Sequence, residues 1–234
     1  MGFRRRYRSL PDSMVRPLGG RGFTLVEMAV GLVILVLLFA AVVKGRDLID
    51  HSHNKRMLGS LKALETAIWE YRDALERWPG DCDGDGVIGY RPVDGVDAGL
   101  ALDAKLVDPL SLSCDAAATE DPEHKDTAFA DLRLHQVLRQ KTPNAVLARH
   151  PAGGLMHIGS LQDASSGEST NLIVLYHVTV ATARYLDRHL DGSEDGRRGR
   201  LRRWDSSPGN LGIAWPAQDE RLVAVSYQFE NTLP

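Results

Sequence analysis

The stretch Arg21-Gly22-Phe23-Thr24-Leu25-Val26-Glu27 decides how the rest of this chain is interpreted. It is followed by sixteen uncharged, mostly apolar residues, Met28 to Val43, and the first polar cluster begins at Lys44. The twenty-one residues 23–43 span about 30 Å as a helix, enough to cross the hydrocarbon of a bilayer. An ionised carboxylate within a bilayer costs roughly 2.5–3.5 kcal/mol, so we expect Glu27 to have a function that offsets this cost.

The residues before this segment are basic. Residues 1–22 contain six arginines and one acidic residue, Asp12, which gives about +5, and we expect them to stay in the cytoplasm. A secretory signal peptide would place an A-x-A-like cleavage site after its apolar run, and Ala40-Ala41-Val42 matches that pattern poorly. We therefore expect the apolar segment to be retained as a membrane anchor.

The basic leader, Gly22, Phe23 and Glu27 together resemble the processing site of type IV pilins and of the related pseudopilins of type II secretion. The resemblance implies that a prepilin peptidase cleaves after Gly22 and methylates the new terminal amine of Phe23. It also implies that Glu27 neutralises the N-terminal amine of a neighbouring subunit during assembly. Phe23 and Glu27 lie four residues apart, on one face of a helix. The alternative is a simple signal anchor in which Glu27 lies near the membrane interface.

The resemblance extends to location and partners. It implies a single-pass protein of the inner membrane with a cytoplasmic leader and a periplasmic C-terminal domain, which later joins a periplasmic or extracellular filament. The implied partners are the prepilin peptidase, the inner membrane and other pilin or pseudopilin subunits, contacted through the N-terminal helix. The proline that major pilins often carry just after the apolar segment is missing here, which favours a minor subunit. Trp78-Pro79-Gly80-Asp81 and Leu186–Gly192 are similar to segments of larger pilin-like proteins.

The charge of the chain bears on the class of partner. The whole chain carries −3, and loss of the leader would leave about −8, which disfavours nucleic acid as the main partner. One basic run, Arg197–Trp204, has three interpretations: a charged strand edge, a phosphate-contacting patch, or a contact with the acidic loops of a neighbouring subunit. The second keeps a DNA- or surface-binding minor pilin, for adhesion or DNA uptake, as the alternative function. No nucleophile–base–acid set stands out, so we expect no enzyme; an unrelated anchored periplasmic enzyme is the third hypothesis.

The apolar periodicity predicts an α+β fold. Spacings of three and four from Leu58 to Trp78 predict an amphipathic half that continues the apolar segment as one helix over about 24–78, ended by Pro79-Gly80. We expect this helix to pack on a small antiparallel sheet with additional short helices. Further helices are predicted at 128–140 and 179–190, and strands at 155–161, 172–178 and 222–229. The expected organisation is a cleaved leader (1–22), a transmembrane or filament-core helix (23–43), its amphipathic half (44–78) and a periplasmic pilin-like domain (79–234).

The first acidic loop has the pattern of a calcium-binding loop. Asp81, Asp83 and Asp85 form D-x-D-x-D-G, which offers three oxygen ligands and a turn glycine, with the carbonyl of Val87 as a further ligand. The twelfth position is not a glutamate, so a closing carboxylate would come from Asp94 or Asp97. The alternative is an Asp-Gly turn that binds nothing.

A second loop repeats this pattern less completely. Asp191, Ser193 and Asp195 form D-x-S-x-D-G, again without a glutamate at the twelfth position, and make a weaker calcium candidate. Apart from calcium, we expect no cofactor.

The chain has two cysteines, Cys82 and Cys114. Both belong to the part expected to be exported, where an oxidising compartment allows them to pair. A Cys82–Cys114 disulfide would tie down the first acidic loop. The rival is an intermolecular bridge between two copies of the chain.

Overall fold

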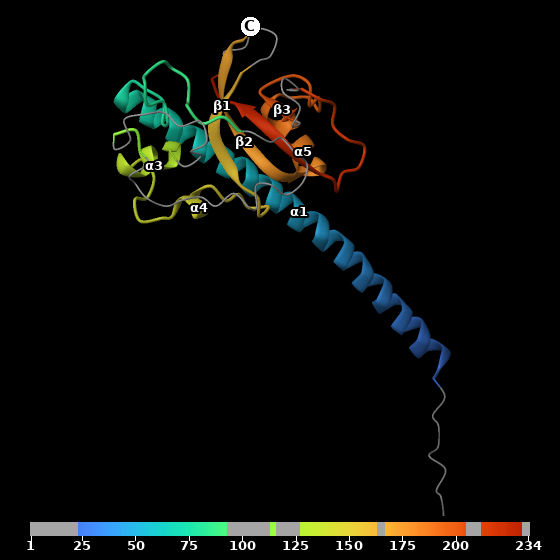
Figure 1. Cartoon of the computed structure of the whole chain (residues 1–234). Coiled ribbons are helices and arrows are strands. Elements are labelled where there is room, and N and C mark those ends of the chain that lie inside the picture. The colour runs from blue at the N-terminus through green and yellow to red at the C-terminus, as the bar shows by residue number, and fades with distance from the viewer. Residues whose placement is uncertain (1–22, 93–112, 116–126, 163–166, 205–211, 231–234) are drawn as a thin grey trace, which may run out of the picture. The chain divides into compact units, whose positions relative to one another are not determined.

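The computed structural model describes residues 23–92, 113–115, 127–162, 167–204 and 212–230. These residues form a long helix, a four-stranded antiparallel sheet and short helices, which confirms the predicted α+β fold (Figure 1). The chain divides into two compact units, Met1–Asp47 and Leu48–Pro234. The elements are α1 (Leu25–Leu75), α3 (Thr127–Leu134), α4 (Asn144–Leu147), β1 (Met156–Gln162), β2 (Ser169–Thr179), α5 (Val180–Leu190), β3 (Leu201–Trp204) and β4 (Leu222–Gln228).

The first part of α1 is apolar and exposed. By length and composition it is able to cross a membrane, and its most apolar eighteen-residue window has 0 % of its residues buried. Thr24 caps the start of the helix, because its hydroxyl accepts a hydrogen bond from the backbone N–H of Glu27 at 3.2 Å. The position of Glu27 in the first turn also places a negative charge at the positive end of the helix dipole.

The second part of α1 belongs to the core of the larger unit. Residues spaced by three and four along it are buried, as the periodicity predicted: Met57, Leu61, Leu64, Ile68 and Tyr71. The helix ends at Leu75, three residues before the predicted end, because Glu76 adopts a left-handed φ of 58°. Trp78 is nevertheless buried, and its ring packs against Trp69 and Phe229 at 5.0 and 5.3 Å.

The sheet has the strand order β1-β2-β4-β3, so β2 and β4 are central. From Val223 to Gln228 both faces of β4 are buried. Each central strand has a neighbour on both sides, and the core includes residues of α1, α3 and α5 as well as of the sheet. Ser226 and Gln228 are therefore buried polar residues of the sheet rather than solvent-facing ones.

The short elements follow the sequence closely except at their ends. Helix α5 begins as expected after Thr179, whose hydroxyl accepts a hydrogen bond from the N–H of Thr182. Helix α3 stops at Leu134 rather than Gln140, because Gln136 takes a left-handed φ of 62°. The fourth strand, β3, lies in the basic run and forms one edge of the sheet, in agreement with the interpretation of that run as a charged strand edge.

Candidate functional site

The predicted processing site lies at the start of α1. Phe23 is 76 % exposed and Glu27 is also exposed, in the first turn of the helix. Gly22 and the leader lie outside the described residues. The structure therefore places Phe23 and Glu27 at the exposed beginning of an apolar helix.

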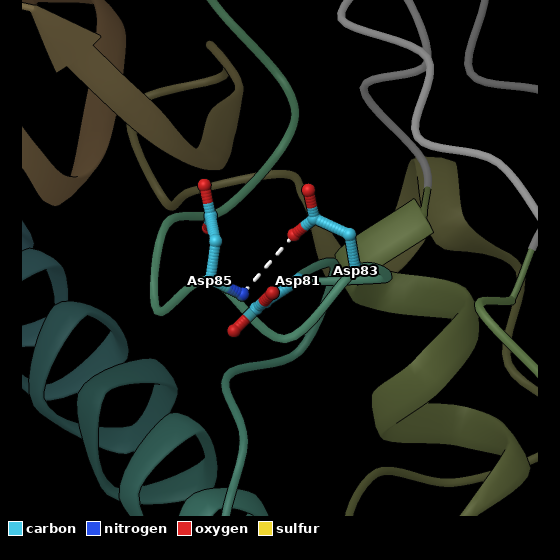
Figure 2. Close-up of side chains that lie close together, drawn as sticks. All are labelled: Asp81, Asp83 and Asp85. Carbon is cyan, nitrogen blue, oxygen red and sulfur yellow. Dashed lines mark hydrogen bonds between the residues drawn. The ribbon is translucent and has the colours of Figure 1, made fainter.

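The first acidic loop gathers its three predicted carboxylates. One carboxylate oxygen from each of Asp81, Asp83 and Asp85 lies within 4.8 Å of the others (Figure 2). Asp81 is 2 % exposed, whereas Asp83 and Asp85 are exposed. Burial raises the pKa of Asp81, although hydrogen bonds from the backbone of Gly84 and Gly86 act against this rise. The arrangement offers one buried and two exposed oxygen ligands to a hard cation.

Backbone hydrogen bonds shape this loop. The Asp81 carboxylate accepts from the N–H groups of Gly84 and Gly86 at 2.8 and 3.1 Å. Both glycines have a positive φ, which other residues adopt only with strain. The Asp83 carboxylate accepts from the N–H of Asp85 (Figure 2), and the Asp85 carboxylate accepts from the N–H of Val87, a pattern typical of Asx turns. The carboxylates thus have partners within the loop, which a plain turn would also supply.

Strand β2 anchors the far end of the loop. The Asn171 amide oxygen accepts from the N–H of Ile88 at 2.8 Å, and its amide nitrogen donates to the carbonyl of Gly86 at the same distance. Val87, the expected carbonyl ligand, donates its own N–H to Asp85. The closing carboxylates considered from the sequence, Asp94 and Asp97, lie outside the described residues.

The disulfide Cys82–Cys114 is present, with a Cα–Cα distance of 4.9 Å. Next to it, the fully buried Asp131 of α3 accepts from the N–H of Gly80 and from the N–H of Cys114, both at 2.8 Å. One carboxylate therefore holds the backbone on both sides of the bridge. This role was not predictable from the sequence, because Asp131 stands in an ordinary amphipathic pattern.

The second acidic loop follows a buried aspartate, Asp187, that was not predicted from the sequence as a site residue. Asp187, on the last turn of α5, is fully buried and accepts from the indole N–H of Trp215 at 2.9 Å. Burial, together with the nearby carboxylates of Asp191 and Asp195, raises the pKa of Asp187 to about 6. Ser193 is exposed. Within the described residues, Asp187, Asp191 and Asp195 are not all within 4.8 Å of one another, unlike the carboxylates of the first loop.

The basic run is largely used within the fold. Arg200 forms an ion pair with Glu65 of α1 at 2.6 Å, and Arg202 donates to the carbonyl of Gly199. Arg203 is 8 % exposed and donates to the carbonyl of Ala214. Arg197 and Arg198 are the exposed arginines of the run. Fewer arginines are therefore available to contact phosphate than the sequence suggested.

Comparison with protein-family models, with curated proteins and with solved structures finds no match for this chain. The resemblance to pilins and pseudopilins therefore rests on the residues around Gly22, Phe23 and Glu27 and on the helix that follows them.

Proposed function

We propose that this protein is a minor pilin or pseudopilin: a structural subunit that is processed at Gly22, anchored in the inner membrane and assembled into a type IV pilus or a type II secretion pseudopilus. One observation carries the proposal. A single helix, α1, starts two residues after Phe23 and has Glu27 in its first turn; it continues through an exposed apolar part and ends in a part that is buried in an α+β unit.

The two parts of α1 differ in whether their apolar side chains are covered from water. From Met57 to Tyr71, the second part contributes buried apolar residues to the core of its own unit, and these residues need no further cover. The first part exposes large apolar residues such as Leu32, Leu37 and Phe39, each more than 60 % exposed. Exposed apolar surface of this extent is unfavourable in water and marks an interaction with lipid or with other proteins. Lipid before assembly, and the helices of other subunits after it, would each provide that cover.

The experiment that tests this function is the N-terminal mass of the membrane-bound protein. In a host that contains a prepilin peptidase, we expect the mature chain to begin at Phe23 and to carry one added methyl group. Gly22→Ala should leave the leader attached. Gly31→Ala is the matched control, because the Cβ that it adds has nothing within 4 Å, and it should be processed like wild type. A wild-type chain that begins at any other residue would refute the proposal.

We also propose that the first acidic loop binds calcium as a structural ion. The convergence of three carboxylate oxygens within 4.8 Å supports this assignment. Asp81, Asp83 and Asp85 repel one another when ionised, and a divalent cation would relieve that repulsion.

A further inference from the structure

We propose that the second acidic loop binds a divalent cation of the calcium type between Asp187 and Asp191, with Asp187 as its buried ligand. This site goes beyond the filament function and beyond the first loop. It rests on the surroundings of one oxygen atom, Oδ1 of Asp187.

Asp187 is 0 % exposed, and within the described structure its Oδ1 has no hydrogen-bond partner. Its other oxygen accepts from Trp215, which fixes the direction of the carboxyl group. A buried acceptor without a partner costs free energy, and the cost is larger for a charged group. A cation or a proton bound to Oδ1 would remove this cost.

Asp187 also interacts with a second carboxylate, that of Asp191. Asp187 and Asp191 are four residues apart at the end of α5 and interact through their side chains. Asp191 uses Oδ2 to accept from the N–H of Leu201 at 2.8 Å. Two ionised carboxylates are both acceptors, so they can face each other only with a proton or a cation between them.

The loop after Asp191 favours the cation. It carries the Ser193 hydroxyl, the Asp195 carboxylate and backbone carbonyls, which are hard oxygen groups of the kind that calcium takes in numbers of six to eight. Because Asp187, Asp191 and Asp195 are not all within 4.8 Å of one another, only Asp187 and Asp191 are assigned as direct carboxylate ligands. Asp195 accepts from the N–H of Arg197 through Oδ1, which leaves Oδ2 for an ion or for a bridging water. Gly199 keeps the backbone close: a Cβ at this position would lie 2.4 Å from Oδ2 of Asp191. Magnesium demands a tighter octahedron and suits such a loop less well.

The test uses the full-length protein in detergent, in an Asp83→Ala/Asp85→Ala background that removes two ligands of the first loop. The probe is Tb³⁺, whose luminescence is sensitised by a nearby indole such as that of Trp215, with competition by Ca²⁺. We expect saturable emission that Ca²⁺ displaces. Asp187→Asn should weaken Tb³⁺ and Ca²⁺ binding at least tenfold. Asp219→Asn is the matched control, since Asp219 is exposed and pairs with Arg184, and it should bind like the background protein.

Two results would overturn the proposal. The first is Ca²⁺ affinity in Asp187→Asn equal to that of the background protein. The second is absence of Tb³⁺ and Ca²⁺ binding by the folded background protein at concentrations up to about 10 mM, above the roughly 10⁻⁴–10⁻³ M range of extracellular sites; a proton would then join the two carboxylates. Should Asp187→Asn fail to fold, Asp191→Asn replaces it, with the same tenfold loss expected and unchanged affinity as the contradicting result.

Discussion

Arg200 donates a hydrogen bond to Glu65 at 2.6 Å across 135 residues of sequence, and so joins the turn before β3 to helix α1. Lys62 and the hydroxyl of Tyr227 donate to the other oxygen of the same carboxylate, at 2.7 and 2.9 Å. Glu65 is thus the point at which the helix, the central strand β4 and the edge strand β3 are held together. Burial acts to raise the pKa of Glu65, but these three donors outweigh it and the pKa is lowered.

Removal of the arginine should destabilise the larger unit. Arg200→Ala leaves Glu65 partly buried with one donor fewer, and we expect a loss of about 1–3 kcal/mol in the free energy of unfolding. Urea denaturation of the full-length protein in detergent, followed by tryptophan fluorescence, measures it. The control is Arg198→Ala, at an exposed position, which should stay within about 0.5 kcal/mol of wild type. Equal losses in the two variants would show that the Arg200–Glu65 pair does not stabilise the fold.

The same pair predicts a dependence on pH. Because the pKa of Glu65 is lower in the folded protein than its ordinary value of 4.5, the unfolded chain binds this proton more readily. The stabilisation is therefore present above pH 4.5 and is lost as the pH falls below it. Wild type should lose more stability than Glu65→Gln when the pH is lowered from 6 to 4, in the same urea experiment. Parallel pH profiles would contradict this assignment.

The disulfide should contribute more than any single hydrogen bond. Cys82 and Cys114 are 32 residues apart, and closing a loop of that size stabilises a fold by about 3–4 kcal/mol in the chain-entropy model. We expect Cys82→Ser/Cys114→Ser to lower the free energy of unfolding by about this amount. Asp131→Asn should cost less, because the amide oxygen can still accept from one of the two N–H groups. Two free thiols in the oxidised wild-type protein, or a dimer on a non-reducing gel, would contradict the intramolecular bridge.

Elements with a strong apolar period were predictable from the sequence, and their ends were not. The buried side of α1 and the position of α5 follow directly from spacings of three and four. The ends of α1 and α3 depend on Glu76 and Gln136, which take a left-handed conformation without being glycine. Neither residue type indicates this, because glutamate and glutamine adopt a positive φ only rarely.

The two acidic loops also differ in how far their sites could be predicted from the sequence. The aspartates of the first loop are adjacent in sequence, so their convergence was predictable from the D-x-D-x-D-G pattern. The role of Asp187 was not predictable, because its hydrogen-bond partner Trp215 is 28 residues away in the sequence. The basic run was interpreted as a charged strand edge, but the burial of Arg203 in β3 and its hydrogen bond to the carbonyl of Ala214 were not predictable.

A buried histidine predicts a second dependence on pH. His150 is 2 % exposed; its Nε2–H donates to the carbonyl of Tyr176 at 2.7 Å, and its Nδ1 accepts from the N–H of Ala152, which requires the neutral ring. Burial lowers its pKa below 6.5. Stability should therefore fall as the pH drops below 6.5, because the unfolded chain binds the proton first. His150→Gln should flatten this fall between pH 7 and 5, and His53→Gln, at an exposed position, should not.

Calcium at the first loop should raise thermal stability. A ligand that binds only the folded state stabilises it by RT ln(1 + c/Kd) at a free concentration c, which is about 1.4 kcal/mol at a tenfold excess over the Kd. We expect the melting temperature of Asp187→Asn, chosen to remove the second site, to rise in millimolar calcium relative to chelator. The further change Asp83→Ala should abolish this rise. If both variants melted at the same temperature in calcium and in chelator, Asp81, Asp83 and Asp85 would form a turn that binds no calcium.

The last prediction concerns Glu27. Its backbone N–H is capped by Thr24, and this bond does not involve its side chain, so Glu27→Leu should leave the start of α1 intact. Removing a carboxylate from an apolar segment should also favour membrane insertion. We nevertheless expect the variant to be incorporated into filaments poorly, because the amine of a neighbouring subunit would lose its counter-charge. Glu27→Gln keeps a polar side chain but removes the charge, and we expect it to be incorporated into filaments equally poorly.

The measurement is the ratio of variant to wild-type subunit that co-purifies with filaments when both are expressed at equal level. Met28→Leu is the matched control, since it changes an exposed neighbour in the same helix without changing charge. Incorporation of Glu27→Leu equal to that of Met28→Leu would refute amine pairing. It would leave Glu27 with the favourable interaction between its charge and the helix dipole, which is worth less than about 1 kcal/mol at an exposed position.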